Sequence, residues 1–92
     1  MNYKKIYIYK YIFSMNEIII SCPHCNQLSI IKINELNCRI FRCGVYKYNF
    51  VQIPPHLDKL SCELLVTNKL IYGCSKPFKI DNDYKARVCD YI

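Results

Sequence analysis

Residues 22–25 read Cys-Pro-His-Cys, and this motif constrains the chain more than any other feature. Two cysteines separated by two residues can present both thiolates from one tight turn, which supplies half of a tetrahedral zinc site. The runs at 18–20 and 28–33 on either side are rich in β-branched residues, which favour strands. We therefore expect a hairpin whose tip presents Cys22 and Cys25.

The chain has only 92 residues but contains seven cysteines. A domain of this size has a thin hydrophobic core and often depends on a metal, on disulfides or on a partner. An odd number of cysteines cannot all pair within one chain, and no small-residue cleavage site follows the basic start. We therefore expect a metal-binding protein of a reducing, intracellular compartment, with no segment that spans a membrane.

A structural zinc site needs four ligands, so two more must come from elsewhere in the chain. The candidates are Cys38, Cys43, His56, Cys62, Cys74 and Cys89. Cys74 follows Gly73 in a turn-like segment, and Cys62 lies on a predicted helix that leads into it. We therefore predict Zn²⁺ bound by Cys22, Cys25, Cys62 and Cys74. Cys38, Cys43 and His56 are the alternatives, either as replacements or as a second site.

The remaining patterns predict a small β-rich α+β domain, like a zinc ribbon, with one helix. Residues 34–53 favour one or two strands, with Gly44 at a turn between them. Apolar residues at helical spacing predict a helix over residues 57–67. The apolar stripe of that helix consists of Leu57, Leu60, Leu64 and Leu65. Residues 70–80 predict a closing hairpin.

Residues 1–14 differ from the rest, since they carry three lysines and no acidic residue. We expect them to be an extension that is disordered or lies upstream of a start at Met15. Residues 15–92 would then form a single zinc-binding domain. An edge strand is the alternative for the extension, because β-branched and aromatic residues dominate it.

The net charge of +6 allows contact with nucleic acid without demanding it. Cations beside aromatic rings suit single strands, whose bases stack on rings. The candidates are Lys32, Arg39, Arg42, Lys47, Lys76 and Lys79, with Tyr46, Tyr48, Phe50 and Phe78. The competing interpretation places the aromatic rings in the core. The predicted function is a non-enzymatic zinc module that binds nucleic acid or a protein partner, with no small-molecule substrate.

Two enzymatic alternatives remain open at the level of sequence. CPHC also occurs as a redox dithiol, but there the first cysteine opens a helix that lowers its pKa. The residues after Cys25 are strand-like and offer no such helix. A zinc hydrolase would need an open metal position and a base, and no carboxylate lies in a recognisable catalytic motif.

Several segments resemble a group of short, uncharacterised zinc-ribbon-like proteins of large DNA viruses. The matching segments are CPHC at 22–25, NCRIFRCG at 37–44, Pro55-His56, Cys62 and YGCSKPFKI at 72–80, which span most of residues 18–80. The resemblance implies a viral origin and a metal site, and it implies no activity. Its members look as if they carry His where this chain has Cys43. Since both residue types bind zinc, this difference favours Cys43 as a ligand and weighs against Cys62.

Overall fold

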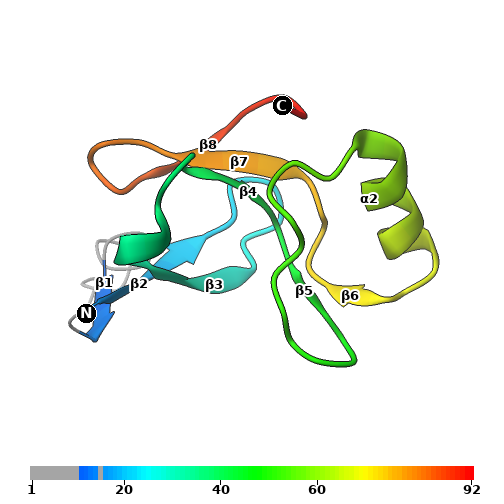
Figure 1. Cartoon of the computed structure of the whole chain (residues 1–92), viewed down its shortest axis with the longest axis horizontal. Helices are drawn as coiled ribbons and strands as arrows, with labels where there is room; N and C mark the ends of the chain where they lie inside the picture. Colours follow the sequence, from blue (N-terminus) through cyan, green and yellow to red (C-terminus); the bar gives the residue numbers. More distant parts are fainter. Residues whose placement is uncertain (1–10, 15) are drawn as a thin grey trace.

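The computed structural model describes residues 11–14 and 16–92, which form a β-rich α+β fold (Figure 1). The elements are β1 (Tyr11–Ser14), β2 (Glu17–Ser21), β3 (Leu28–Lys32), the 3-10 helix η1 (Ile33–Glu35), β4 (Ile40–Arg42), β5 (Val45–Tyr46), α2 (Lys59–Thr67), β6 (Ile71–Tyr72), β7 (Pro77–Ile80) and β8 (Ala86–Val88). This confirms the α+β class that the sequence predicts.

The hairpin around the CPHC motif forms as predicted. β2 and β3 pair antiparallel, with Ile18 opposite Ile31 and Ile20 opposite Ser29. Because side chains alternate along a strand, Ile18, Ile20 and Ile31 all enter the core. β1, which consists of the last four residues of the extension, adds an edge strand to this sheet. Residues 1–10 lie outside the described part of the chain.

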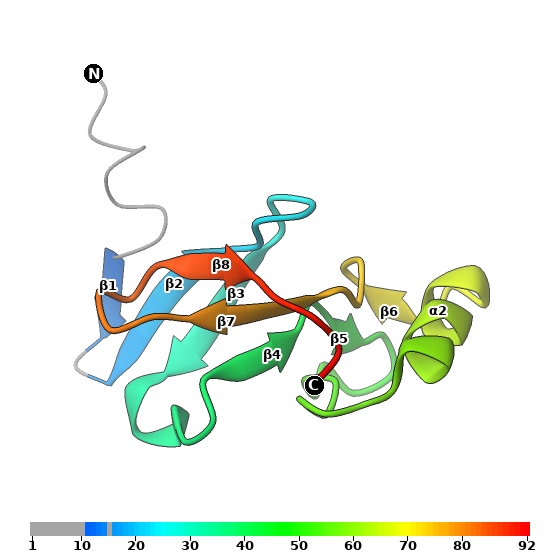
Figure 2. The same ribbon diagram turned by 90° about the horizontal axis from the view of Figure 1, so that it is seen from above.

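A second sheet of β4, β7 and β8 covers the first one. Figure 2 shows β7 and β8 running across β2 and β3. Phe78 and Ile80 of β7 pack against the buried isoleucines, and the rings of Phe41 and Phe78 stack with centroids 5.6 Å apart. We call these six strands the two-sheet core. The tail strand β8 is a part of it that the sequence patterns did not predict.

The prediction of a closing hairpin over residues 70–80 is wrong. β6 pairs with β5, Tyr72 lying opposite Val45, while β7 pairs with β4, Pro77 lying opposite Arg42. The chain thus forms one antiparallel ribbon, from β4 to β5 and back from β6 to β7. Between the two paired positions lie two residues on one strand and four on the other, so the ribbon contains a large, irregular bulge.

Residues 44–73, with β5, β6 and α2, extend from one side of the two-sheet core in both views (Figures 1 and 2). We call this part the hairpin–helix lobe. α2 begins after Asp58, whose carboxylate accepts a hydrogen bond from the backbone N–H of Ser61 at 3.0 Å. The leucine stripe is not its buried face, since Leu60 is 65% exposed and Cys62 is fully buried. No helix in the described ranges is long and apolar enough to cross a membrane.

Candidate metal centre

Four cysteine sulfurs lie together where the two-sheet core joins the hairpin–helix lobe. The Sγ atoms of Cys22, Cys25, Cys43 and Cys74 all lie within 4.8 Å of one another. The Cys22–Cys74 distance is 3.9 Å, and the Cys25–Cys43 distance is 3.7 Å. Four thiolates placed tetrahedrally about 2.3 Å from a zinc ion would be about 3.8 Å apart. Two of the sulfur pairs therefore have the spacing that a tetrahedral ion requires, and the other pairs lie within 4.8 Å.

The turn between β2 and β3 supplies the first two sulfurs. Its backbone closes through a hydrogen bond from the N–H of Asn26 to the carbonyl of Cys22, at 2.9 Å. Asn26 adopts a positive φ of 68°, which asparagine tolerates better than most residues. The backbone N–H of His24 donates to the Cys22 sulfur at 3.3 Å. The His24 ring is 2.8 Å from the carbonyl of Pro77, which anchors the turn on β7.

The bulged ribbon supplies the other two sulfurs, and two glycines make this possible. A Cβ atom on Gly73 would lie 2.6 Å from the Gly44 Cα and 2.7 Å from the Cys43 carbonyl oxygen. Only a residue without a side chain allows the two strands to cross this closely. The backbone N–H of Ser75 then donates to the Cys43 carbonyl at 2.7 Å. This crossing places Cys43 beside Cys74, although 30 residues separate them.

Hydrogen bonds and burial shift the pKa values of Cys22, Cys43 and Cys74 in different directions. A hydrogen bond from Cys43, together with backbone N–H groups, lowers the pKa of Cys22 to about 5 against the effect of burial. The same contact, and then burial, raise the pKa of Cys43. Burial raises the pKa of Cys74 to about 11. A divalent cation bound here would displace the protons of Cys43 and Cys74, because thiolates are the metal ligands.

The structure brings Cys22, Cys25 and Cys74 together and places Cys43, not Cys62, beside them. This corrects the predicted group of four. Cys62 is buried in α2, and its sulfur donates to the carbonyl of Leu57 at 3.6 Å. The helix therefore uses Cys62 as a small packing residue instead of aiming it at the other thiols.

No second cluster of metal-ligating side chains is found among the residues that the structure describes. Cys38 is exposed, and its sulfur lies 3.8 Å from the carbonyl of Ile40. The Nδ1 of His56 lies 2.9 Å from the carbonyl oxygen of Ile92. The alternative of a second site formed by Cys38, Cys43 and His56 is thus not supported by their placement.

The sequence does contain a signal for Cys43. Cys43 precedes a glycine and Cys74 follows one, so the two dipeptides are mirror images along the chain. Antiparallel pairing sets such mirrored dipeptides opposite each other, and paired glycines allow close approach of the two backbones. This pattern indicates Cys43 as a ligand only if the two segments are assumed to pair with each other.

The predicted nucleic-acid residues divide into two groups. Arg42 and Phe78 are buried, at 2% and 1% exposure, and cannot meet a partner at the surface. Arg42 instead donates to the carbonyls of Leu57 and Ile92, at 2.9 and 3.1 Å. By contrast, Tyr48 and Phe50 are 81% and 68% exposed, so the core does not contain them.

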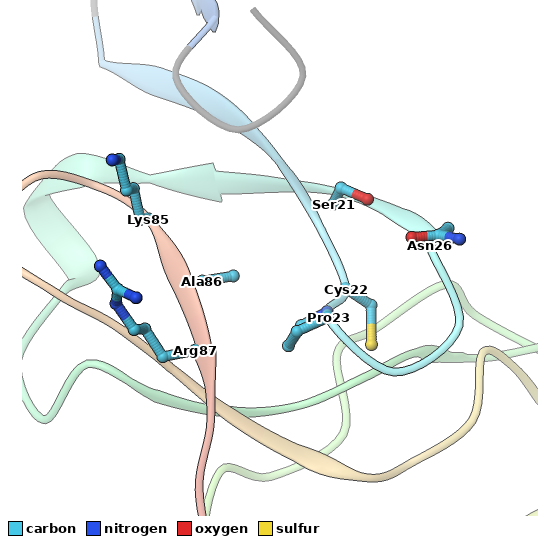
Figure 3. A pocket seen from close by; sticks show the side chains of 7 residues that line it. All are labelled: Ser21, Cys22, Pro23, Asn26, Lys85, Ala86 and Arg87. Carbon is cyan, nitrogen blue, oxygen red and sulfur yellow. The ribbon is translucent and has the colours of Figure 1, made fainter. Parts of the chain in front are cut away.

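A cleft of about 350 Å³ lies beside the CPHC turn (Figure 3). It is lined by Ser21, Cys22, Pro23, Asn26, Lys85, Ala86 and Arg87. Figure 3 shows Lys85 and Arg87 extending away from the turn, and Arg87 forms an ion pair with Asp81 at 2.8 Å. Binding sites for small molecules usually have several polar groups that converge on the ligand. This cleft does not show that arrangement.

Comparison of the chain with protein-family models, curated proteins and solved structures gives no match. The assignment of the site therefore depends on its own geometry.

Proposed function

We propose that this chain is a small, non-enzymatic zinc module in which one Zn²⁺ ion is bound by Cys22, Cys25, Cys43 and Cys74. The observation that supports this most directly is the spacing of the four sulfurs, which fits a tetrahedral ion. The ion would fasten the CPHC turn to the crossing of the ribbon. The role of the module is to hold an interaction surface in place for nucleic acid or protein.

The donor set favours a structural ion over a catalytic one. Four thiolates occupy all the positions of a tetrahedral ion, so no position remains for an activated water. Tetrahedral sites made of four sulfurs are typical of zinc and of iron. Backbone N–H groups support the sulfurs, as with His24 and Cys25 at Cys22 and Lys76 at Cys74, and offset the negative charge of the thiolates.

The first test is native mass spectrometry of the untagged chain, purified under reducing conditions, with and without a strong chelator. We expect one bound zinc ion, and we expect its removal to unfold the hairpin–helix lobe. An iron ion in its place would contradict the identity of the metal. A metal-free, folded chain that oxidises reversibly at Cys22 and Cys25 would overturn the proposal in favour of a redox dithiol.

Cysteine variants locate the ligands. Cys43→Ser should lose zinc, because it removes one of the four clustered sulfurs. Cys38→Ser is the matched control, since Cys38 is exposed and outside the cluster, and it should bind one zinc ion like the parent chain. Cys62→Ser separates the two ligand sets. Loss of zinc in Cys62→Ser, with zinc retained in Cys43→Ser, would contradict the assignment.

A further inference from the structure

The ribbon of the hairpin–helix lobe has an outer face that carries aromatic rings and a lysine. In the β5–β6 pair, Ile71 is buried opposite Tyr46, so this register position faces inward. Tyr72 is the next residue, and it points to the other side because side chains alternate. Lys47 and Phe50 lie against Tyr72 there, and we call these three residues the aromatic face.

The rings of the aromatic face are stacked and remain accessible. Phe50 and Tyr72 have centroids 6.0 Å apart and planes inclined by 10°. The Lys47 ammonium lies 5.2 Å from the centre of the Tyr72 ring. Phe50 is 68% exposed and Tyr72 48% exposed, and Tyr48 at the tip of the same turn is 81% exposed. A flat aromatic ligand could therefore stack on several rings without any rearrangement of the core.

Phe50 occupies a backbone position that does not suit a bulky residue. Its φ is +58°, and its N–H donates to the Tyr46 carbonyl at 2.8 Å to close the turn. Glycine or asparagine normally fills such a left-handed position, because a large side chain is strained there. The ring gains no burial in return. Strain of this kind tends to persist where a side chain has a function, which here points to the exposed ring.

The charges around the aromatic face complement a polyanion. Residues 45–52 and 69–72 include Lys47 and Lys69 and no acidic residue, and the whole chain carries a net charge of +6. We propose that this face binds single-stranded nucleic acid, with bases stacked on Phe50 and its neighbouring rings and phosphates close to the lysines. A duplex would fit poorly, because its bases are already stacked on each other.

This inference rests on the proposed function, because the metal centre fixes the ribbon. β5 follows Gly44 and β6 precedes Gly73, so a single glycine separates each strand from a clustered cysteine. The two proposals can nevertheless be tested independently of each other. Zinc content measured on each sample tests the metal centre, and nucleic-acid affinity tests the aromatic face.

The test is fluorescence anisotropy with the zinc-loaded full chain and labelled oligonucleotides of about 15 nucleotides, as oligo-dT, oligo-U and a duplex of equal length. We expect at least one single strand to bind more tightly than the duplex, and the affinity to fall as salt rises. Comparison of the two single strands then shows which of oligo-dT and oligo-U the face binds more tightly. Equal or tighter binding of the duplex would overturn the proposal.

Phe50→Gly is the decisive variant, because it removes the ring and also relieves the positive φ, so the turn should still form. We expect it to weaken single-strand binding about tenfold. Lys47→Gln should reduce the dependence of binding on salt. Leu60→Ser is the control, since Leu60 is an exposed apolar residue on α2 in the same lobe, and its affinity should match that of the parent chain.

Two results contradict the proposal directly. One is zinc-loaded protein that binds neither single strand, and the other is Phe50→Gly with unchanged affinity. If the chain instead self-associates in sedimentation and Phe50→Gly abolishes that association, the aromatic face serves a second copy of the chain, and the nucleic-acid proposal is rejected. Single-strand binding through Phe50 by a chain that holds no zinc would preserve this inference and overturn the metal centre.

Discussion

The two-sheet core and the hairpin–helix lobe are built on different physical principles. The core buries large apolar side chains between its sheets, namely Ile18, Ile20, Ile31, Phe78 and Ile80. Within the lobe, the buried apolar residues are Ile53, Cys62 and Ile71. The lobe also holds eight of the twelve exposed large apolar residues in the described ranges: Tyr48, Phe50, Val51, Leu60, Leu64, Val66, Leu70 and Tyr72.

This difference indicates how the lobe is held in place. With so little buried apolar surface, it depends on its attachments at the cysteine cluster. The bulged ribbon joins it to Cys43 and Cys74, and the buried hydroxyl of Ser75 donates to the carbonyl of Cys62 at 2.9 Å. Ser75 directly follows the clustered Cys74, so this hydrogen bond connects α2 to the cysteine cluster. In the proposed zinc module, the bound ion would substitute for the core that the lobe lacks.

Metal removal should have the largest effect, and it should affect the two regions unequally. Structural zinc sites contribute about 10–16 kcal/mol in small domains at neutral pH, which is comparable to the whole stability of an ordinary protein. We expect a chelator to abolish amide exchange protection throughout the lobe, while β2 and β3 retain measurable protection. Hydrogen–deuterium exchange with and without chelator measures this. Equal loss of protection in both regions would show that the two regions form one cooperative unit.

The next largest difference should come from truncating one large apolar side chain in each region and comparing the loss of stability. Phe78→Ala removes a ring that is 1% exposed, and it should destabilise the protein by about 3–5 kcal/mol. Leu60→Ala removes a side chain that is 65% exposed, and it should cost less than about 0.5 kcal/mol. Urea unfolding of the zinc-loaded variants tests both values. A large cost at Leu60 would mean that the lobe has a core of its own.

Gly73→Ala should weaken the joint between the regions. The added Cβ would meet the Gly44 Cα at 2.6 Å, and the φ of +116° disfavours any side chain. We expect a loss of about 2–4 kcal/mol, together with weaker zinc binding, because the strands that carry Cys43 and Cys74 must separate. Competition with a chromophoric chelator measures the zinc affinity. Asn26→Gly is the control, and it should leave that affinity unchanged.

Lys69→Gly should strengthen the lobe alone. Lys69 follows Asn68, the C-cap of α2, with a φ of +56°, and the N–H of the next residue donates to the Leu65 carbonyl at 3.0 Å. Glycine is the usual residue at this position of a helix end. We expect a gain of about 0.5–1 kcal/mol in thermal or urea unfolding. Lys69→Ala retains the strained Cβ atom and should show no such gain, so an equal gain there would reject the explanation.

The smallest effect concerns the turn between β7 and β8. The Arg87 guanidinium, with backbone N–H groups, lowers the pKa of Asp81 to about 2. A lowered pKa stabilises the fold above the unfolded pKa of about 4, and this contribution disappears only as the pH falls through about 2. Asp81→Asn should therefore lower the urea midpoint slightly and by the same amount at pH 5.5 and pH 7.5. The exposed neighbour Asp83→Asn should show no change. A difference that shrinks at pH 5.5 would contradict the shifted pKa.

Local chemistry explains the parts that the sequence predicts well. The β2–β3 hairpin follows from β-branched runs on either side of a two-cysteine turn. The sequence predicts a helix over 57–67 and α2 lies at 59–67, because Asp58 caps its N-terminus and Pro54-Pro55 precede it. Each of these signals is contained within a few residues, so no knowledge of distant contacts is needed.

The remaining features depend on distant contacts. The sequence analysis predicts Cys62 as a ligand and keeps Cys43 as an alternative, and only the pairing of β4 with β7 places Cys43 beside Cys74. The helical spacing of Leu60 and Leu64 predicts a helix, but it cannot show whether another element covers those residues. For the same reason residues 70–80 look like a hairpin, because strand propensity does not identify the partner strand.

The crossing at Gly44 and Gly73 has a consequence for how such a chain can change over evolutionary time. The segment between these glycines leaves and returns at the same point, so its two ends are already in contact. Replacing residues 45–72 by a short turn would leave all four clustered cysteines in the chain, with β4 leading directly into β7 as an ordinary hairpin. Because closure entropy depends only weakly on loop length, insertions of very different size would be tolerated at this point. The lobe could therefore be replaced by segments of other lengths without separating the four clustered cysteines.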